Sequence, residues 1–133
     1  MKPLLALGLG ALLLAGCANH AAQPESGQTY RVEWIGERPL MDRSYLTLTL
    51  DGQGRAYGSA GCNHWFASYQ LDGDKLSFGQ AGSTMKACAP ALMEQEQRFI
   101  KALGDVQRWE ITDQGQLRLW PATGRSIRLW PES

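Results

Sequence analysis

Alternating apolar and polar residues predict that this chain folds mainly into β-strands. The clearest alternation is "YLTLTL" at residues 45–50, where Leu46, Leu48 and Leu50 would face one way and the tyrosine and threonines the other. The turn sequence "DGQG" at residues 51–54 follows, and residues 55–58 would begin a returning strand. These segments together predict a β-hairpin.

Two weaker strand patterns lie on either side of this hairpin. Residues 30–35 alternate, so that Tyr30, Val32 and Trp34 would share one face. The turn sequence "DGD" at residues 72–74 precedes a short strand at residues 75–78. Glycine is abundant, at 15 of 133 residues. The whole pattern favours a mostly β domain with many turns.

One helix is predicted at about residues 90–103. Pro90 suits the first turn, where its missing N–H would have no partner in any case. Glu94 and Arg98 form a favourable i,i+4 pair, and Gly104 is placed to cap the C-terminal end. Apolar residues at helical spacing would face the core: Leu92, Phe99, Ile100 and Leu103.

The chain ends with two related segments, "LRLWP" at residues 117–121 and "IRLWP" at residues 127–131. They predict a hairpin whose core face carries Leu117, Leu119, Ile127 and Leu129 and whose other face carries Arg118, Trp120, Arg128 and Trp130. Because Trp and Arg are enriched at interface hot spots, this second face is a candidate interaction surface. The simpler interpretation is that both tryptophans only cover the sheet.

Two registers of this hairpin keep its faces matched. A three-residue loop with Gly124 in the left-handed conformation places Arg118 opposite Arg128. A five-residue loop places Trp120 opposite Arg128 and Arg118 opposite Trp130, where cation–π contacts could form. The sequence does not decide between these registers.

The first residues are typical of an export signal. An apolar run at residues 3–14 is shorter than the about 20 residues that a membrane-spanning helix needs. The following "LAGC" resembles the lipobox of bacterial lipoproteins, which implies that Cys17 is lipidated, and Ala18 resembles the outer-membrane class. We therefore expect a lipoprotein signal peptide at 1–16, the lipidated cysteine and a flexible tether at 17–27, and one domain at 28–133. The lipid would hold this domain on the outer membrane, in the periplasm.

After Cys17, the chain contains only Cys62 and Cys88. Two cysteines in one exported domain most often form a disulfide, which would contribute about 3.5 kcal/mol through unfolded-state entropy. The alternatives are a zinc or copper site of Cys62, His64 and Cys88, a catalytic cysteine, or free thiols. Tight structural zinc usually has four protein ligands, so we predict no metal site. Gly61 and Asn63 are typical of a structural corner between two strands.

The remaining composition narrows the classes of function. The chain carries 13 basic and 13 acidic residues with no basic stripe, which argues against a nucleic-acid partner. It contains no Ser nucleophile motif, phosphate loop or HExxH motif, so we expect no enzymatic activity, no catalytic residue and no cofactor. Another possibility for binding is a pocket for a small ligand lined by Trp34, Trp65 and Tyr69.

Several of these motifs, in this order, resemble the META domain family of the HslJ type. They are the strand with Trp34, the Leu-rich strand before Asp51, Gly58 with "GCN" at 61–63, Tyr69, "STM" at 83–85 with Ala87 and Cys88, a helix with Glu94 and Phe99, and the terminal Leu-x-Leu hairpin. The resemblance implies an α+β fold, with one helix packed against a curved antiparallel sheet or partial β-barrel.

Members of that family are heat-inducible bacterial outer-membrane lipoproteins, and no catalysed reaction is established for the family. The resemblance therefore implies a stress-related, non-enzymatic envelope lipoprotein. It would bind an envelope protein partner or stabilise the envelope. The alternative is a module of the periplasm that binds a small hydrophobic ligand.

Overall fold

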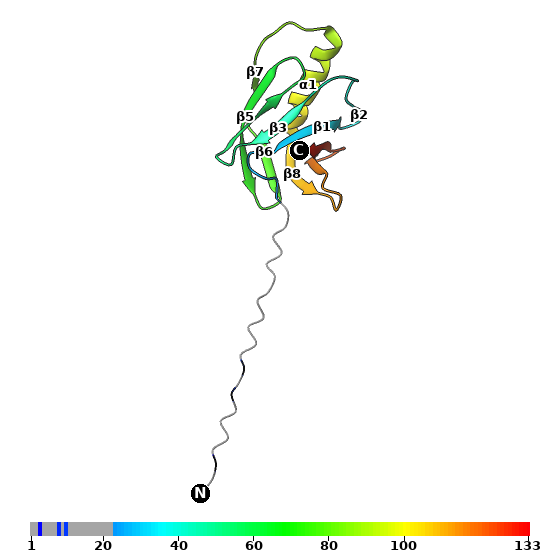
Figure 1. The fold of residues 1–133 in the computed structure, drawn as a ribbon. Coiled ribbons are helices and arrows are strands. Elements are labelled where there is room, and N and C mark those ends of the chain that lie inside the picture. The colour runs from blue at the N-terminus through cyan, green and yellow to red at the C-terminus, as the bar shows by residue number, and fades with distance from the viewer. Residues whose placement is uncertain (1–2, 4–7, 9, 11–22) are drawn as a thin grey trace.

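The computed structural model describes residues 3, 8, 10 and 23–133. The predicted lipidation site, Cys17, and nearly all of the predicted signal peptide lie outside the described residues. Figure 1 shows residues 23–133 as strands that wrap around a common centre, with one helix packed on them.

Eight antiparallel strands of the described residues form a closed barrel. Their order is β1 (Thr29–Ile35), β3 (Thr47–Leu50), β4 (Arg55–Ser59), β5 (His64–Asp72), β6 (Lys75–Phe78), β8 (Val106–Ile111), β9 (Leu117–Pro121) and β10 (Ile127–Pro131). The barrel closes because β10 pairs with β1, for example at Leu129 opposite Val32. The short strands β2 (Arg38–Pro39) and β7 (Gly82–Ser83) pair with β1 and β5 outside this ring.

The prediction of a curved sheet or partial barrel with one helix was therefore right in kind, but the barrel is closed and the fold is mostly β. Closure has a physical benefit, because a free strand edge exposes unpaired backbone groups to other chains. Pairing of β1 with β10 covers the edges that the first and last barrel strands would otherwise expose.

The core contains the residues that alternation predicted to face inward. Leucines and isoleucine from both predicted hairpins are buried: Leu46, Leu48, Leu50, Leu117, Leu119, Ile127 and Leu129. In the predicted "DGQG" turn, Gly52 and Gly54 have φ of 82° and 90°, a conformation that glycine adopts without steric cost. The β3–β4 hairpin is thus confirmed.

The helix α1 (Pro90–Asp105) begins at the predicted proline and buries Phe99 and Leu103 completely. Its C-terminal end differs from the prediction. Gly104 lies inside the helix, and Val106 leaves it in an extended conformation as the first residue of β8. The predicted pair of Glu94 with Arg98 is also replaced, because Glu94 forms its ion pair with Arg38 at 3.8 Å.

An irregularity in β1 corrects the predicted strand face. Tyr30 and Val32 are buried, as the alternation predicts. The register with β10 shifts between Val32 and Trp34, and Ile35 is the next buried residue. A β-bulge shifts the side-chain alternation beyond it. Glu33 and Trp34 therefore both lie on the outer side, and Trp34 does not share a face with Tyr30.

The terminal hairpin has the register predicted with the three-residue loop, although residues 122–126 connect the end of β9 to the start of β10. Arg118 lies opposite Arg128, and Gly124 has a φ of 105°. The register with the five-residue loop was wrong, because β9 and β10 find their cation–π partners on the neighbouring strands. Arg128 lies 5.1 Å from the ring centre of Trp34, and Arg108 lies 5.0 Å from that of Trp120.

The described part of the predicted tether packs on the barrel. Pro24 is buried, and the Gly27 N–H donates to the Leu50 carbonyl at 2.8 Å. The Glu25 N–H donates to the Tyr30 hydroxyl at 3.1 Å. Residues 23–27 therefore belong to the folded domain, which begins before residue 28.

Candidate functional site

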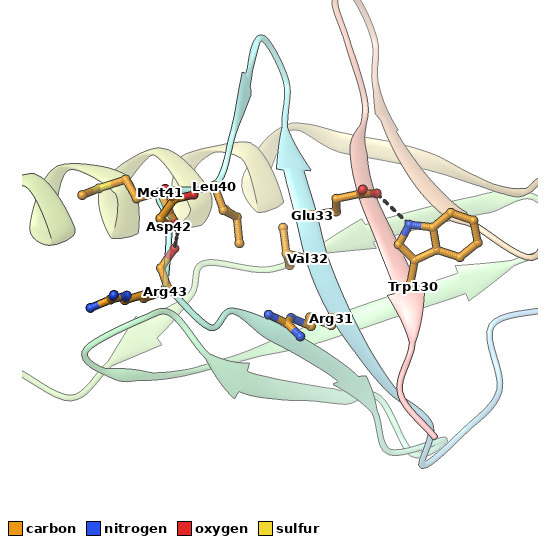
Figure 2. Close-up of a pocket in the computed structure, with 9 residues that line it drawn as sticks. Arg31, Val32, Glu33, Leu40, Met41, Asp42, Arg43 and Trp130 are labelled. Atoms are coloured by element: carbon orange, nitrogen blue, oxygen red, sulfur yellow. Dashed lines mark hydrogen bonds between the residues drawn. The ribbon is translucent and has the colours of Figure 1, made fainter.

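A surface pocket of about 450 Å³ lies between β1, β10 and the loop that joins β2 to β3. Figure 2 shows its residues, with Val32 and Leu40 between the loop and the strand and Trp130 on the far side of Glu33. The lining residues are Arg31, Val32, Glu33, Leu40, Met41, Asp42, Arg43, Ser44 and Trp130. Leu40 and Met41 supply the accessible apolar surface, since Val32 is only 2% exposed, and arginines and Trp130 lie around it.

The loop wall of this pocket is held in place by hydrogen bonds. The Met41 N–H donates to Gln95 Oε1 of α1 at 2.8 Å, and Gln95 is almost fully buried. The Ser44 hydroxyl and N–H both donate to the Met41 carbonyl, at 2.6 and 3.2 Å. The tight turn places Arg43 at a φ of 65°, where a residue with a Cβ carries strain. Such strained residues gather at binding sites.

The strand wall presents Glu33, which the alternation of β1 places on the outer side together with Arg31. The Glu33 carboxylate accepts a hydrogen bond from Trp130 Nε1 at 2.6 Å and one from Gln116 Nε2 at 3.4 Å. The indole of Trp130 is thereby fixed in orientation, yet 37% of this residue remains exposed. A rigid, exposed indole suits a contact surface.

The charged side chains that line the pocket are balanced in number, with Arg31 and Arg43 beside Glu33 and Asp42. Within residues 23–133, neither Arg31 nor Arg43 forms an ion pair. Arg31 lies 5.6 Å from the ring centre of Tyr45. The Tyr45 hydroxyl donates to Glu132 Oε2 at 2.7 Å, and this hydrogen bond raises the pKa of Tyr45. The pocket thus offers two guanidinium groups without an ion pair, apolar surface and an indole, while the Glu33 carboxylate is occupied by Trp130 and Gln116. The guanidinium groups suit a carboxylate of a ligand that also has an apolar part.

The predicted interaction face lies on the outer side of β9 and β10. Arg118, Trp120 and Arg128 are half-buried, and Trp130 is exposed and lines the pocket. Arg118 donates to Gln116 Oε1 at 2.9 Å and lies 4.0 Å from Glu110. The repulsion expected between Arg118 and the facing Arg128 is therefore offset by partners on either side.

The predicted aromatic pocket is not formed. Trp65 is buried, its indole packs edge-on against Phe78 and Phe99, and its Nε1 donates to the Thr47 carbonyl at 2.9 Å. Trp34 lies on the outer side of the barrel because of the β1 bulge. The Tyr69 hydroxyl accepts a hydrogen bond from the Gly52 N–H at 2.9 Å. The three aromatics therefore do not line one cavity, since Trp65 fills the core and Trp34 faces away from it.

The "GCN" corner is closed by a disulfide between Cys62 and Cys88, whose Cα atoms are 6.4 Å apart. Gly61 turns the chain with a φ of 112°. Both sulfurs are used in this bond, so they cannot serve as thiolate ligands together with the exposed His64. No three His, Cys, Asp or Glu residues of the described part are grouped so that they could hold a metal ion.

Asn63 links this corner to the helix. Its N–H and Nδ2 donate to the two carboxylate oxygens of Glu96, at 3.1 and 3.0 Å. Its Oδ1 accepts from the Thr84 hydroxyl at 3.0 Å and from the Lys86 N–H at 2.7 Å. Asn63 and Glu96 are each only 2% exposed. The corner is therefore a buried polar network, which orders the segments that it joins.

Sequence reasoning missed two parts of this arrangement. Glu96 lies on the same helical face as Leu92, Phe99 and Leu103. An acidic residue within an apolar face could have indicated a buried carboxylate with hydrogen-bond partners. The pocket had no such signal, because Arg31 and Arg43 meet Trp130 only when β1 and β10 pair.

In the described part of the chain, no helix has the length and apolar character needed to cross a membrane. None of the curated proteins matches this sequence. One similar solved structure is the NMR structure of a protein from Burkholderia xenovorans, which is 26% identical with a TM-score of 0.66, over 81% of this chain and 83% of that one. A second NMR structure, 20% identical with a TM-score of 0.63 over 82% and 94% of the two chains, shows the same fold.

The family model described as "META domain" matches residues 23–133, which include the whole barrel and the helix. This match agrees with the motifs along the sequence and with the corner that Cys62, Asn63 and Cys88 build in the structure. The chain belongs to the META domain family.

Proposed function

We propose that this protein is a non-enzymatic lipoprotein of the bacterial envelope that binds a partner protein through the pocket beside Trp130. The observation that carries the proposal is the meeting of an exposed, oriented indole with two arginines that have no ion pair within the described residues. Charged side chains without a partner and exposed aromatics are typical of contact surfaces.

The partner segment that suits this pocket is extended and carries an acidic residue next to an apolar one. Arg31 and Arg43 would pair with its carboxylates, and Leu40 and Met41 would accept its apolar side chain. Beyond Trp130, the outer face with Arg118, Trp120 and Arg128 extends the contact area across β9 and β10.

The proposed location follows from the N-terminal motif. A lipid on Cys17 would hold the protein on the outer membrane, since two acyl chains anchor a protein stably. Binding of an envelope protein from this position would suit a role in stress, either by holding the partner or by stabilising the envelope around it.

Binding of designed peptides tests this proposal. Fluorescence anisotropy should detect a labelled peptide with alternating Asp and Leu, and the peptide with Asn in place of Asp should bind about tenfold more weakly. The variant R31E/R43E should lose this preference. Arg55→Glu, on β4 outside the pocket, is the matched charge-reversal control and should behave like the wild type. Equal affinity for both peptides, or equal loss in the control, would contradict the proposal.

A small anionic amphiphile is the second candidate for the same pocket, since about 450 Å³ lies within the size range of small-molecule sites. Trp130 lines the pocket, so its fluorescence would report such a ligand directly. Two results together would favour this candidate over the peptide. Alkyl carboxylates would quench the Trp fluorescence saturably, with the quenching lost in W130F, and the acidic peptide would not bind.

A further inference from the structure

The loop at residues 84–89, between β7 and α1, displays one apolar side chain to solvent. Met85 is 92% exposed, more than any other large apolar residue in the described part of the chain. Its neighbours Thr84, Lys86 and Ala87 are also exposed. Figure 1 shows this segment as an arch at the upper edge of the molecule. An apolar side chain presented in this way has no packing role in the fold.

Although the side chains point outward, the backbone on both sides of Met85 is held firmly. The Thr84 N–H donates to the His64 carbonyl at 3.0 Å, and the Thr84 hydroxyl accepts from the His64 N–H at 3.0 Å. On the other side, the Lys86 N–H donates to Asn63 Oδ1 at 2.7 Å, and Asn63 Nδ2 donates to the Lys86 carbonyl at 3.3 Å. Three residues after Met85, Cys88 is bonded to Cys62.

The support for this loop is buried and oriented. The carboxylate of Glu96 accepts from both nitrogens of Asn63, which orients the amide so that its Oδ1 accepts from the Lys86 N–H. Within the described residues, the N–H and C=O of Met85 itself make no hydrogen bond. The loop therefore has a fixed backbone on both sides of Met85, while the side chain, N–H and C=O of Met85 are available to a partner.

We propose that this loop is a substrate-like inhibitory loop that occupies the cleft of a serine endopeptidase, with the Met85 side chain in an apolar S1 pocket. In these enzymes the S1 pocket selects the residue before the cleaved bond, and the chymotrypsin pocket is an apolar slot. A segment whose backbone is held on both sides before binding loses less conformational entropy on binding than a free loop. The loop shares no residue with the pocket beside Trp130, so the inference is independent of the proposed function.

The chemistry explains why such a loop inhibits the enzyme rather than being consumed. The serine Oγ attacks the Met85 carbonyl carbon, the enzyme's histidine passes the serine proton to the Lys86 nitrogen, and the Met85–Lys86 C–N bond breaks to leave an ester and an amine. Asn63 Oδ1 and the disulfide hold that amine in place. The amine therefore attacks the ester, re-forms the peptide bond and releases the serine before water replaces it.

Inhibition assays test the assignment of Met85. Residues 23–133, which contain the whole barrel and its core, should inhibit chymotrypsin competitively when the disulfide is intact. M85D should raise the inhibition constant about 100-fold, the loss typical of an anchor residue. Y57D is the matched control, because Tyr57 is also exposed but lies on β4, outside both the loop and the pocket beside Trp130, and it should leave the constant unchanged.

Three outcomes would overturn the assignment: no inhibition with the protein in large excess, equal effects of M85D and Y57D, or inhibition of trypsin that K86A abolishes. Mass spectrometry gives a second readout, in which slow cleavage only after Met85 is expected and rapid, complete cleavage contradicts an inhibitory role. The variant C62S/C88S, with its fold checked by circular dichroism, should be cleaved faster at the same bond. An unchanged cleavage rate would contradict the role given to the disulfide.

Discussion

At the scale of single residues, the pair of Asn63 and Glu96 connects the disulfide corner to the helix. The carboxylate of Glu96 is buried in α1 and accepts two hydrogen bonds from Asn63. Asn63 in turn holds Thr84 and Lys86 through its Oδ1. One buried acid therefore helps to position the loop at residues 84–89 through Asn63, because both Glu96 and Asn63 are buried, where hydrogen bonds are strong.

Replacing Glu96 tests how much this network contributes to the free energy of unfolding. We expect Glu96→Ala to lower the free energy of unfolding by about 2–4 kcal/mol, because both donors of Asn63 would be left buried without an acceptor. The control is Glu94→Ala in the same helix, where an exposed ion pair with Arg38 should contribute at most about 0.5 kcal/mol. Urea unfolding of both variants measures the difference. Similar losses would mean that the network adds nothing beyond helix packing.

At the scale of elements, glycines mark where this chain turns, but not each of them does so. Gly124 lies in the connection between β9 and β10, at residues 122–126, with a φ of 105°. Gly104 lies inside α1 without a positive φ, and a Cβ added to it would meet no atom within 4 Å. The position after an apolar helical pattern predicted a cap at Gly104, but α1 runs one further residue and β8 begins directly at Val106.

The two glycines should therefore respond oppositely to alanine. Gly104→Ala should raise the free energy of unfolding by about 0.5–1 kcal/mol, since alanine is the better residue inside a helix. Gly124→Ala should lower it by about 1 kcal/mol, because alanine is strained at positive φ. Thermal unfolding followed by circular dichroism measures both. Destabilisation by Gly104→Ala would show that this residue caps the helix after all.

At the scale of the whole molecule, the closed barrel brings the two ends of the domain together. β1 and β10 pair along five positions, and Gln28 Nε2 donates to the Glu132 carbonyl at 2.8 Å. This pairing forms the pocket beside Trp130 and places Tyr30 in the core with its hydroxyl under Glu25. Burial raises the pKa of Tyr30 above its ordinary value of 10.0.

The shift at Tyr30 predicts loss of stability in alkaline solution. Below pH 10 the hydroxyl is protonated in both states, so its contribution is fully present. Above pH 10 the unfolded chain releases this proton first, and stability falls as the pH rises towards the folded pKa. Urea unfolding from pH 8 to 11 should show this fall, and Tyr30→Phe should reduce it. Tyr45→Phe, at the exposed surface, should change the alkaline fall in stability less. If the wild type and Tyr30→Phe lost stability identically with pH, Tyr30 would not be the cause of the fall.

The short-range features of this fold could be predicted from the sequence. Alternation predicted the inward leucines of β3, β9 and β10, turn residues predicted the hairpins, and Pro90 predicted the start of α1. These signals are local, because a side chain faces inward or outward according to its immediate neighbours along the strand or helix. The motif that includes "GCN" also predicted the META domain family.

What required the tertiary structure is everything that depends on pairing between distant segments. Closure of the barrel, the bulge that turns Trp34 outward and the union of Arg31, Arg43 and Trp130 in one pocket all follow from β1 meeting β10. The register of the terminal hairpin was decided by β1 and β8, which supply partners for its arginines and tryptophans. The sequence by itself determined which residues could form strands, turns and a helix. Only three-dimensional packing decided which side chains meet, because contacts between distant segments leave no periodic trace along the chain.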